Sequence, residues 1–207
     1  MGEVLFDPYE HYDENRGAFV YPEIADREAA LAQIRQAPIT IDHVDIPQAM
    51  SEEVQFALPY GCGIEASFLG HLKDEGRILN IGWLRVPPDL RGAGVGERLV
   101  KSCIAYAYDH GATRIDSVVS VTTGLKLRRR LFPADKVTIS DYSETSMVSS
   151  QPLTITLDQA VASLERAAEY EEDPEQPSRA FFVTVDLDGT DMTEWERPLT
   201  QFNSSDE

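Results

Sequence analysis

Hydrophobic and polar positions follow two different periods along this chain, and the changes of period divide it into predicted helices and strands. In residues 94–110 the apolar side chains recur every three or four positions, as on one face of a helix, and Gly111 ends the pattern. Residues 77–86 and 114–121 are instead apolar at successive positions, which is typical of strands covered on both faces. These three segments form the predicted centre of the fold.

Further segments of both kinds flank this centre. Residues 50–58 are ambiguous between helix and strand. Asp188-Gly189 is a dipeptide typical of a hairpin turn, here between the apolar segments 180–187 and 190–195. The other predicted helices are 21–37, 123–132 and 157–172, and the other predicted strands are 39–44, 63–72 and one within 136–148.

This order of strands and helices predicts a mixed α/β (α+β) sheet covered by helices. The length of 207 residues suits one domain with an extension. We therefore expect a single domain over 1–207, with a core at about 23–148 and a C-terminal helix plus hairpin at about 150–200.

A glycine-rich segment joins the strand 77–86 to the helix 94–110. It contains Arg91-Gly92-Ala93-Gly94-Val95-Gly96, with glycine at every second position. Without side chains, successive backbone N–H groups can converge on an anion, and the first turn and dipole of the following helix strengthen such a site. Arg91 adds a positive charge. The segment therefore predicts a turn that binds a diphosphate.

Two other phosphate-binding patterns fail here. A Walker loop needs Gly-Lys-Ser/Thr, but Gly96 is followed by Glu97-Arg98. A dinucleotide-binding fingerprint needs a third glycine where Glu97 stands. A plain tight turn before a structural helix is the remaining alternative, although three glycines at a helix start are costly for packing alone.

The charge of the chain is strongly acidic but unevenly distributed. Asp and Glu number 36 against 18 Lys and Arg, a net charge of −18. An acidic surface repels phosphates and so disfavours nucleic acid as a partner. It is also typical of proteins from a salt-rich, halophilic cytoplasm. Equal stability of the protein in dilute and in molar KCl would contradict this halophilic interpretation. Residues 77–132 hold ten basic against four acidic residues, a net charge of +6. A bound small polyanion would explain this basic block.

Other compositional features narrow the class of protein. Cys62 and Cys103 are too few for a disulfide scaffold and too far apart for a zinc knuckle, so we expect buried, reduced thiols and no metal. No apolar run reaches the roughly 18 residues of a membrane span, and no basic leader precedes an apolar stretch. We expect a cytoplasmic protein with no membrane partner, for which a homodimer is possible.

The segment around the glycines resembles the acetyl-CoA-binding signature of the GNAT superfamily of N-acetyltransferases. That signature is a strand ending in Val, then x-Pro-x-x-Gln/Arg-x-x-Gly-x-Gly/Ala, then a helix. Val86, Pro88, Arg91, Gly94 and Gly96 fill it. The resemblance covers roughly residues 63–132, and it implies the acyl-CoA N-acyltransferase fold, a twisted mixed β-sheet whose central parallel strands, here 77–86 and 114–121, splay apart.

The resemblance also implies which residues bind acetyl-CoA, the expected co-substrate. Backbone groups of Leu84, Arg85 and Val86 would pair with the pantetheine amides as an added strand does. Backbone amides of the turn would bind the diphosphate, namely those of Arg91, Gly92, Ala93, Gly94, Val95, Gly96 and Glu97. For the 3′-phosphate the candidates are Arg98, Lys101 and the run 128–130, whose alternative role is a solvated helix face.

At the positions where the family pattern places its catalytic acid and base, this chain carries other residue types. Leu127 stands where many relatives carry a Tyr acid, so Tyr142 and Tyr60 are the replacements considered. Asn80 stands near the place of a Glu base and can hold a water but accept no proton. His71 is a possible base or a structural strand residue, and Glu65 and Glu75 are weaker candidates for the base.

These observations indicate an acetyl-CoA-dependent N-acyltransferase that moves an acyl group to an unidentified primary amine of a small molecule or peptide. The alternative is a non-catalytic acyl-CoA-binding or regulatory domain of the same fold, which would keep the turn and lack the chemistry. A purely structural α/β protein would bind no CoA. The acceptor cannot be inferred from the fold, although the acidic surface favours a cationic one.

Overall fold

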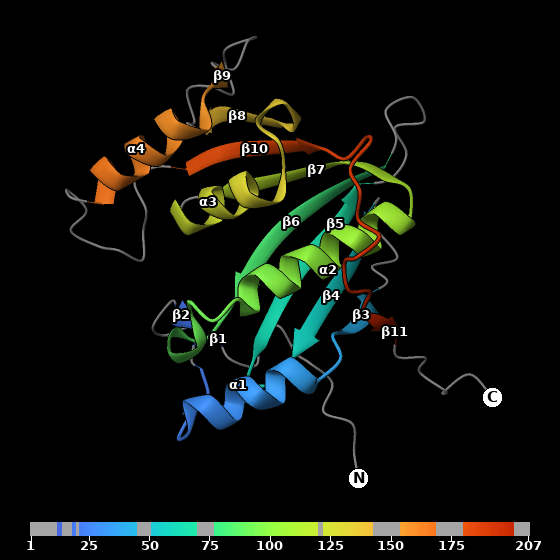
Figure 1. The fold of residues 1–207 in the computed structure, drawn as a ribbon, viewed down its shortest axis with the longest axis vertical. Coiled ribbons are helices and arrows are strands. Elements are labelled where there is room, and N and C mark those ends of the chain that lie inside the picture. The colour runs from blue at the N-terminus through green and yellow to red at the C-terminus, as the bar shows by residue number, and fades with distance from the viewer. Residues whose placement is uncertain are drawn as a thin grey trace. The chain divides into compact units, whose positions relative to one another are not determined.

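The computed structural model describes residues 12–13, 18–19, 21–44, 51–69, 77–119, 122–142, 154–168 and 180–200 (Figure 1). The helices are α1 (Arg27–Gln36), α2 (Val95–Asp109), α3 (Thr122–Leu131) and α4 (Leu157–Ala168), with short 3-10 turns at Pro88–Leu90 and Ala134–Lys136. The strands are β1 (Tyr12–Asp13), β2 (Ala18–Phe19), β3 (Thr40–Val44), β4 (Ser51–Leu58), β5 (Cys62–Leu69), β6 (Arg77–Arg85), β7 (Ala112–Val119), β8 (Val137–Tyr142), β9 (Thr154–Ile155), β10 (Ala180–Asp186) and β11 (Leu199–Thr200).

The described chain forms two compact units. The first contains residues 1–68, 82–110 and 192–207, and the second contains 69–81 and 111–191. Strand β6 passes from one unit into the other. The strands are hydrogen-bonded in the order β11-β3-β4-β5-β6-β7-β10-β8-β9, with parallel and antiparallel pairs, so the predicted mixed α/β sheet is confirmed. The single domain stays a prediction.

In the first unit, α2 covers one face of β4 and β5 (Figure 1). The ring of Tyr106 on α2 lies 5.6 Å from that of Phe56 and 6.1 Å from that of Phe68, measured between centroids. Because side chains alternate along a strand, the even-numbered residues 54–58 of β4 and 62–68 of β5 are buried on the side of the helix. The odd-numbered residues, which include Glu53 and Glu65, therefore belong to the opposite face of the sheet.

Helix α1 of the same unit begins at Arg27, six residues after the predicted start at 21, and ends at Gln36, one residue before the predicted end. The Asp26 carboxylate accepts the Ala29 N–H at 3.0 Å and so caps the first turn. Ala30, Leu31 and Ile34 are buried on one face of the helix. The last turn carries Arg35, and the helix stops before Pro38, which disfavours helical geometry in the residue preceding it.

In the second unit, α3 and α4 lie side by side (Figure 1). Lys126 of α3 pairs with Glu165 of α4 at 2.9 Å. Helix α4 starts with a reciprocal cap, since the Thr156 hydroxyl accepts the Gln159 N–H at 3.2 Å while the Gln159 side chain accepts the Thr156 N–H at 2.9 Å. The β6–β7 pairing of this unit is parallel and ends at Ile81–Ser117.

The C-terminal segment differs from the predicted hairpin. The turn at Asp188-Gly189 is present, with φ of 67° at Gly189. However, residues 190–195 form no strand, and β10 pairs with β7 on one side and β8 on the other. The prediction of a hairpin between 180–187 and 190–195 is therefore wrong, because β10 is an interior strand whose partners β7 and β8 are distant in sequence.

Strand β6 also differs from its predicted burial. Ile78, Leu79 and Ile81 are buried, but Gly82 is exposed, Trp83 is 62% exposed and Leu84 is 40% exposed. The change falls where the pairing with β7 ends, at Ile81. The sequence pattern predicts strands covered on both faces, whereas the second half of β6 leaves apolar side chains accessible to solvent.

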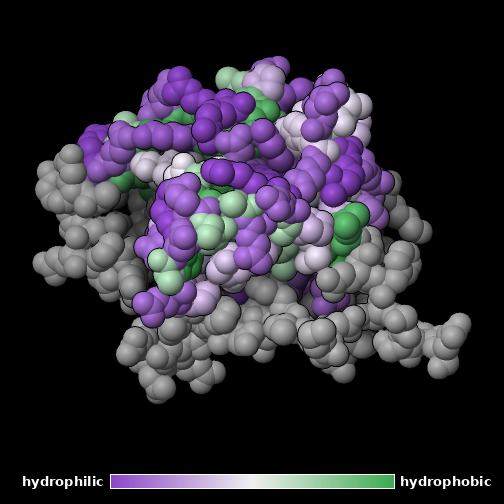
Figure 2. Space-filling model, turned by 60° about the horizontal axis from the view of Figure 1, so that its bottom comes forward, coloured by the Kyte–Doolittle hydropathy of each residue, from purple (hydrophilic) through white to green (hydrophobic). Residues whose placement is uncertain are grey.

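The accessible surface agrees with the acidic composition. Figure 2 shows a face on which hydrophilic residues predominate and hydrophobic ones form small separate patches. Within the described part of the chain, no helix has the length and apolar character needed to cross a membrane.

Candidate functional site

The glycine-rich turn has a backbone conformation that requires glycine at two positions. Gly92 has φ of 77° and Gly94 has φ of 85°, in the left-handed region that other residues enter at a cost. A Cβ at either position would meet no atom within 4 Å. The two glycines are therefore needed for the path of the backbone, and the space beside them is open.

The turn leads directly into the N-terminus of α2. Gly94 is the N-cap residue and supplies no side-chain cap, and the first intrahelical bond joins the Arg98 N–H to the Gly94 carbonyl at 3.0 Å. Backbone N–H groups in the first turn of a helix, here those of Val95 and Gly96, have no acceptor within the helix. Such N–H groups and the positive end of the helix dipole favour an anion, and the diphosphate site at this turn stays a prediction.

Gly96 has a different role from the other two glycines. A Cβ there would lie 3.5 Å from Cδ2 of Leu84 and 3.6 Å from Cγ2 of Val86. These are ordinary van der Waals distances, so the packing of α2 against the end of β6 does not by itself require glycine at this position. The part of Gly96 in binding the diphosphate stays a prediction.

Arg91 closes the turn on itself. Its Nε donates to the Val86 carbonyl at 3.0 Å, and its backbone N–H donates to the Pro88 carbonyl at 3.1 Å. The guanidinium therefore stays beside the residues that the GNAT resemblance assigns to the cofactor. Within the described part of the chain no carboxylate pairs with it.

Arg98, a candidate for the 3′-phosphate, is engaged in a structural network. Its Nε and Nη2 donate to both carboxylate oxygens of Glu196, at 2.7 and 2.6 Å. The same guanidinium donates to the carbonyls of Ile34 and Ala37 at the end of α1. It thereby satisfies helix-end acceptors that would otherwise lack partners, and it ties α1, α2 and the C-terminal segment together.

We expect Arg98→Ala to lower the free energy of unfolding by about 2–3 kcal/mol, because helix carbonyls and a carboxylate lose a charged donor. Lys101→Ala is the matched control on the same helix. Among the described residues, Lys101 forms an i,i+4 pair with Glu97 at 3.0 Å, worth about 0.5 kcal/mol at most. Urea unfolding of both variants provides the comparison, and equal losses would contradict the assigned role.

Three residues of the basic block form ion pairs with acids outside it. Arg129 pairs with Asp158 at 2.7 Å, Lys126 pairs with Glu165 and Arg98 pairs with Glu196. Arg128 is neither a solvated residue nor a free phosphate ligand, since it is only 7% exposed and donates to the Ser117 hydroxyl at 3.2 Å. The three outside carboxylates offset half of the local excess of +6, which is therefore weaker support for a bound polyanion than the sequence suggests.

Glu65 of β5 is a carboxylate whose surroundings shift its pKa. Burial raises the pKa of Glu65, the neighbouring Glu53 carboxylate raises it further, and the Arg85 guanidinium lowers it. Arg85 itself is only 4% exposed. The carboxylate lies beside Gly82, where a Cβ would be 3.9 Å from Glu65 Oε1. A carboxylate with a raised pKa beside an exposed strand end is suited to accept a proton.

The raised pKa of Glu65 also predicts how the stability of the protein depends on pH. Because its folded-state pKa is raised above the ordinary 4.5, the folded protein binds this proton more tightly than the unfolded chain. Its contribution to stability is therefore lost as the pH rises from about 4.5 through the folded pKa. We expect Glu65→Gln to remove this loss, so that its stability gain over the unchanged protein grows with pH in that window. Urea unfolding at a series of pH values, with exposed Glu194→Gln as control, measures it.

The other catalytic candidates have mixed outcomes. Asn80 is half-buried in β6 and is in register with Asp116 of β7, whose carboxylate accepts from Thr184 at 2.9 Å. Tyr60 donates its hydroxyl to Gln33 at 2.7 Å, on α1. Leu127 is buried in α3. The backbone of Tyr142 lies in β8, whereas its side chain, like His71 and Glu75, lies outside the described residues.

Both cysteines are buried, as expected, and both are free thiols in this structure. Burial raises the pKa of Cys62 to about 12, so its thiol stays protonated and is a poor nucleophile. Among the described residues, no cluster of three or more His, Cys, Asp or Glu side chains is arranged to hold a metal ion.

Comparison with known proteins is consistent with the turn. Residues 60–131 match the model of the acetyltransferase (GNAT) family. An acetyltransferase of Bacillus subtilis in complex with CoA is 14% identical, with a TM-score of 0.42 over 72% of this chain and 99% of its own. A GNAT family acetyltransferase of Elizabethkingia anophelis with acetyl-CoA bound is 12% identical, with a TM-score of 0.42 over 73% and 100%. No curated protein matches the chain significantly.

Proposed function

We propose that this chain, whose residues 60–131 match the model of the acetyltransferase (GNAT) family, transfers the acetyl group of acetyl-CoA to a primary amine. The family match supports acyl transfer in general, and the primary amine acceptor is our proposal. The observation that carries it is the turn at Gly92 and Gly94, whose positive φ angles direct the chain into the uncapped start of α2. This geometry fits a diphosphate.

The end of β6, in the same unit as the turn, offers a surface that suits the pantetheine arm of acetyl-CoA. The side chains of Leu84 and Val86 face the start of α2, beside the turn. Leu84 is 40% exposed at the end of β6. An exposed apolar strand end next to a phosphate site suits the pantetheine arm, whose amides pair with backbone groups of residues 84–86 in this proposal.

The reaction itself is a direct displacement. The neutral amine attacks the thioester carbonyl and a C–N bond forms. The C–S bond then breaks, the nitrogen releases one proton to give the amide, and the CoA thiolate takes up one proton to leave as the free thiol. We assign Glu65 to accept the proton that the acceptor ammonium must lose first, since its raised pKa brings it closer to neutral pH. Asn80, His71 and Tyr142 stay predictions.

Calorimetry with acetyl-CoA, together with release of free thiol over a panel of amines, tests the proposal. The panel contains spermidine, an aminoglycoside and a lysine-rich peptide, because the acidic chain favours cationic acceptors. Binding with thiol release that depends on one amine supports the proposal. Binding without release on any amine supports the non-catalytic alternative, with which the buried Leu127 at the usual acid position agrees. Absence of binding contradicts both.

A further inference from the structure

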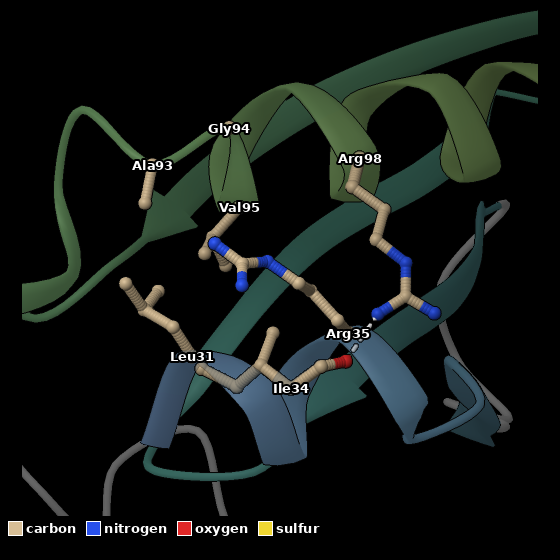
Figure 3. Close-up of a pocket in the computed structure, with 7 residues that line it drawn as sticks. All are labelled: Leu31, Ile34, Arg35, Ala93, Gly94, Val95 and Arg98. Carbon is tan, nitrogen blue, oxygen red and sulfur yellow. Dashed lines mark hydrogen bonds between the residues drawn. The ribbon is translucent and has the colours of Figure 1, made fainter. Parts of the chain in front are cut away.

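A small pocket opens between α1 and the start of α2, beside the glycine-rich turn (Figure 3). Its volume is about 60 Å³. Leu31, Ile34 and Val95 line it with aliphatic side chains, and Arg35 and Arg98 add two guanidinium groups. The pocket therefore combines an apolar wall with positive charge at the place where the anion site begins.

The two sides of this pocket are held in place by hydrogen bonds. At one end of α1, Arg27 Nε donates to the Asp89 carbonyl, 2.8 Å away, in the segment that leads to the turn. At the other end, Arg98 donates to the carbonyls of Ile34 and Ala37. Helix α1 is thus positioned against the turn before any ligand binds, which lowers the ordering cost of binding.

Arg35 has an unusual electrostatic position. It projects from the last turn of α1, and Figure 3 shows its side chain extended toward Gly94 and Val95, at the start of α2. A cation is unfavourable at the positive end of a helix dipole. Arg98, in the same pocket, is neutralised by Glu196, whereas Arg35 has no hydrogen bond or ion pair within the described part of the chain.

A bound anion would resolve this arrangement, because it interacts favourably with both the guanidinium and the helix dipole. We infer that Arg35 is a further ligand-binding residue, whose guanidinium binds the diphosphate of acetyl-CoA together with the backbone amides of the turn. This inference rests on the proposed function. It adds a residue from α1, outside residues 60–131 that match the family model.

Calorimetry on the full chain tests the inference with two probes, acetyl-CoA and its 3′-dephospho analogue. We expect Arg35→Ala to weaken both by about tenfold, as the loss of one charged hydrogen bond does. Arg35→Lys should recover part of the affinity. Arg166→Ala is the matched control, since Arg166 is also an exposed arginine in the last turn of a helix, and it should leave both affinities unchanged.

The outcomes separate the inference from the proposed function. If the unchanged protein binds no acetyl-CoA, the proposed function fails, and this inference fails with it. If the unchanged protein binds and Arg35→Ala binds equally well, only this inference is overturned. A loss confined to acetyl-CoA also overturns it, because the 3′-phosphate would then be the partner. Melting temperatures without ligand show whether the variants are folded. If Arg35→Ala is unfolded, its loss of affinity is no evidence, and the affinity of Arg35→Lys decides the inference instead.

Discussion

Gly94→Val is expected to lower the affinity for acetyl-CoA by about 100-fold or more. Gly94 has φ of 85°, and a β-branched residue held there costs about 1–3 kcal/mol. The backbone relieves this strain by leaving the left-handed region, which turns the N–H groups at the start of α2 away from a common point. Two charged hydrogen bonds to a diphosphate, at about 1.5 kcal/mol or more each, are lost as a result. Calorimetry measures the change.

Gly189→Val is the matched control for strain. Gly189 has φ of 67° and, like Gly94, has no atom within 4 Å of a Cβ, but it lies in the turn after β10. Both variants should lose comparable stability, and only Gly94→Val should lose binding. Equal binding by the two would show that the conformation of the glycine-rich turn has no part in holding acetyl-CoA.

Glu65→Gln is expected to lower kcat/KM for the best amine acceptor by about 100-fold while the affinity for acetyl-CoA stays unchanged. Glutamine preserves the shape and polarity of the side chain but takes up no proton. At higher pH more of the amine is already neutral in solution, so the deficit of the variant should shrink as the pH rises. Thiol release over a pH series, with calorimetry on the same sample, measures both quantities.

Glu53→Gln sharpens this experiment because it leaves Glu65 in place. The Glu53 carboxylate raises the pKa of Glu65, so its removal should lower that pKa. A base is active when deprotonated, and the acidic limb of the kcat/KM profile should therefore move to lower pH while the maximal rate is retained. A rate in Glu65→Gln equal to that of the unchanged protein would exclude Glu65 as the base.

The elements around the site were predictable because their signals are local. Strand β6, helix α2 and the glycines between them follow from hydrophobic period and from the conformational freedom of glycine, which depend on neighbouring residues only. The same signals predicted β3, β7 and α3 to within a few residues of their observed bounds. Gly92 and Gly94 have the positive φ angles that are needed for a turn whose backbone N–H groups point toward one anion.

The placement of β10 was not predictable in this way. An Asp-Gly turn indicates that the chain reverses, but not which strand then pairs with which, because the partners of a strand are chosen by long-range packing. Here the chain after Gly189 leaves the neighbourhood of β10, and β11 pairs in parallel with β3. The hairpin prediction was wrong because it paired residues 180–187 with the segment that follows the turn, whereas β10 pairs with β7 and β8.

The sequence by itself therefore determined the glycine-rich turn, its resemblance to the GNAT acetyltransferases and the mixed sheet that carries it. Only the tertiary structure decided which charges are available there, because an ion pair joins residues that are far apart in the chain. It assigned Arg98 to Glu196 and to α1. It also set Glu65 beside Glu53 and Arg85, and it brought Arg35 to the start of α2. Burial and proximity, which a linear pattern does not contain, set these electrostatic properties.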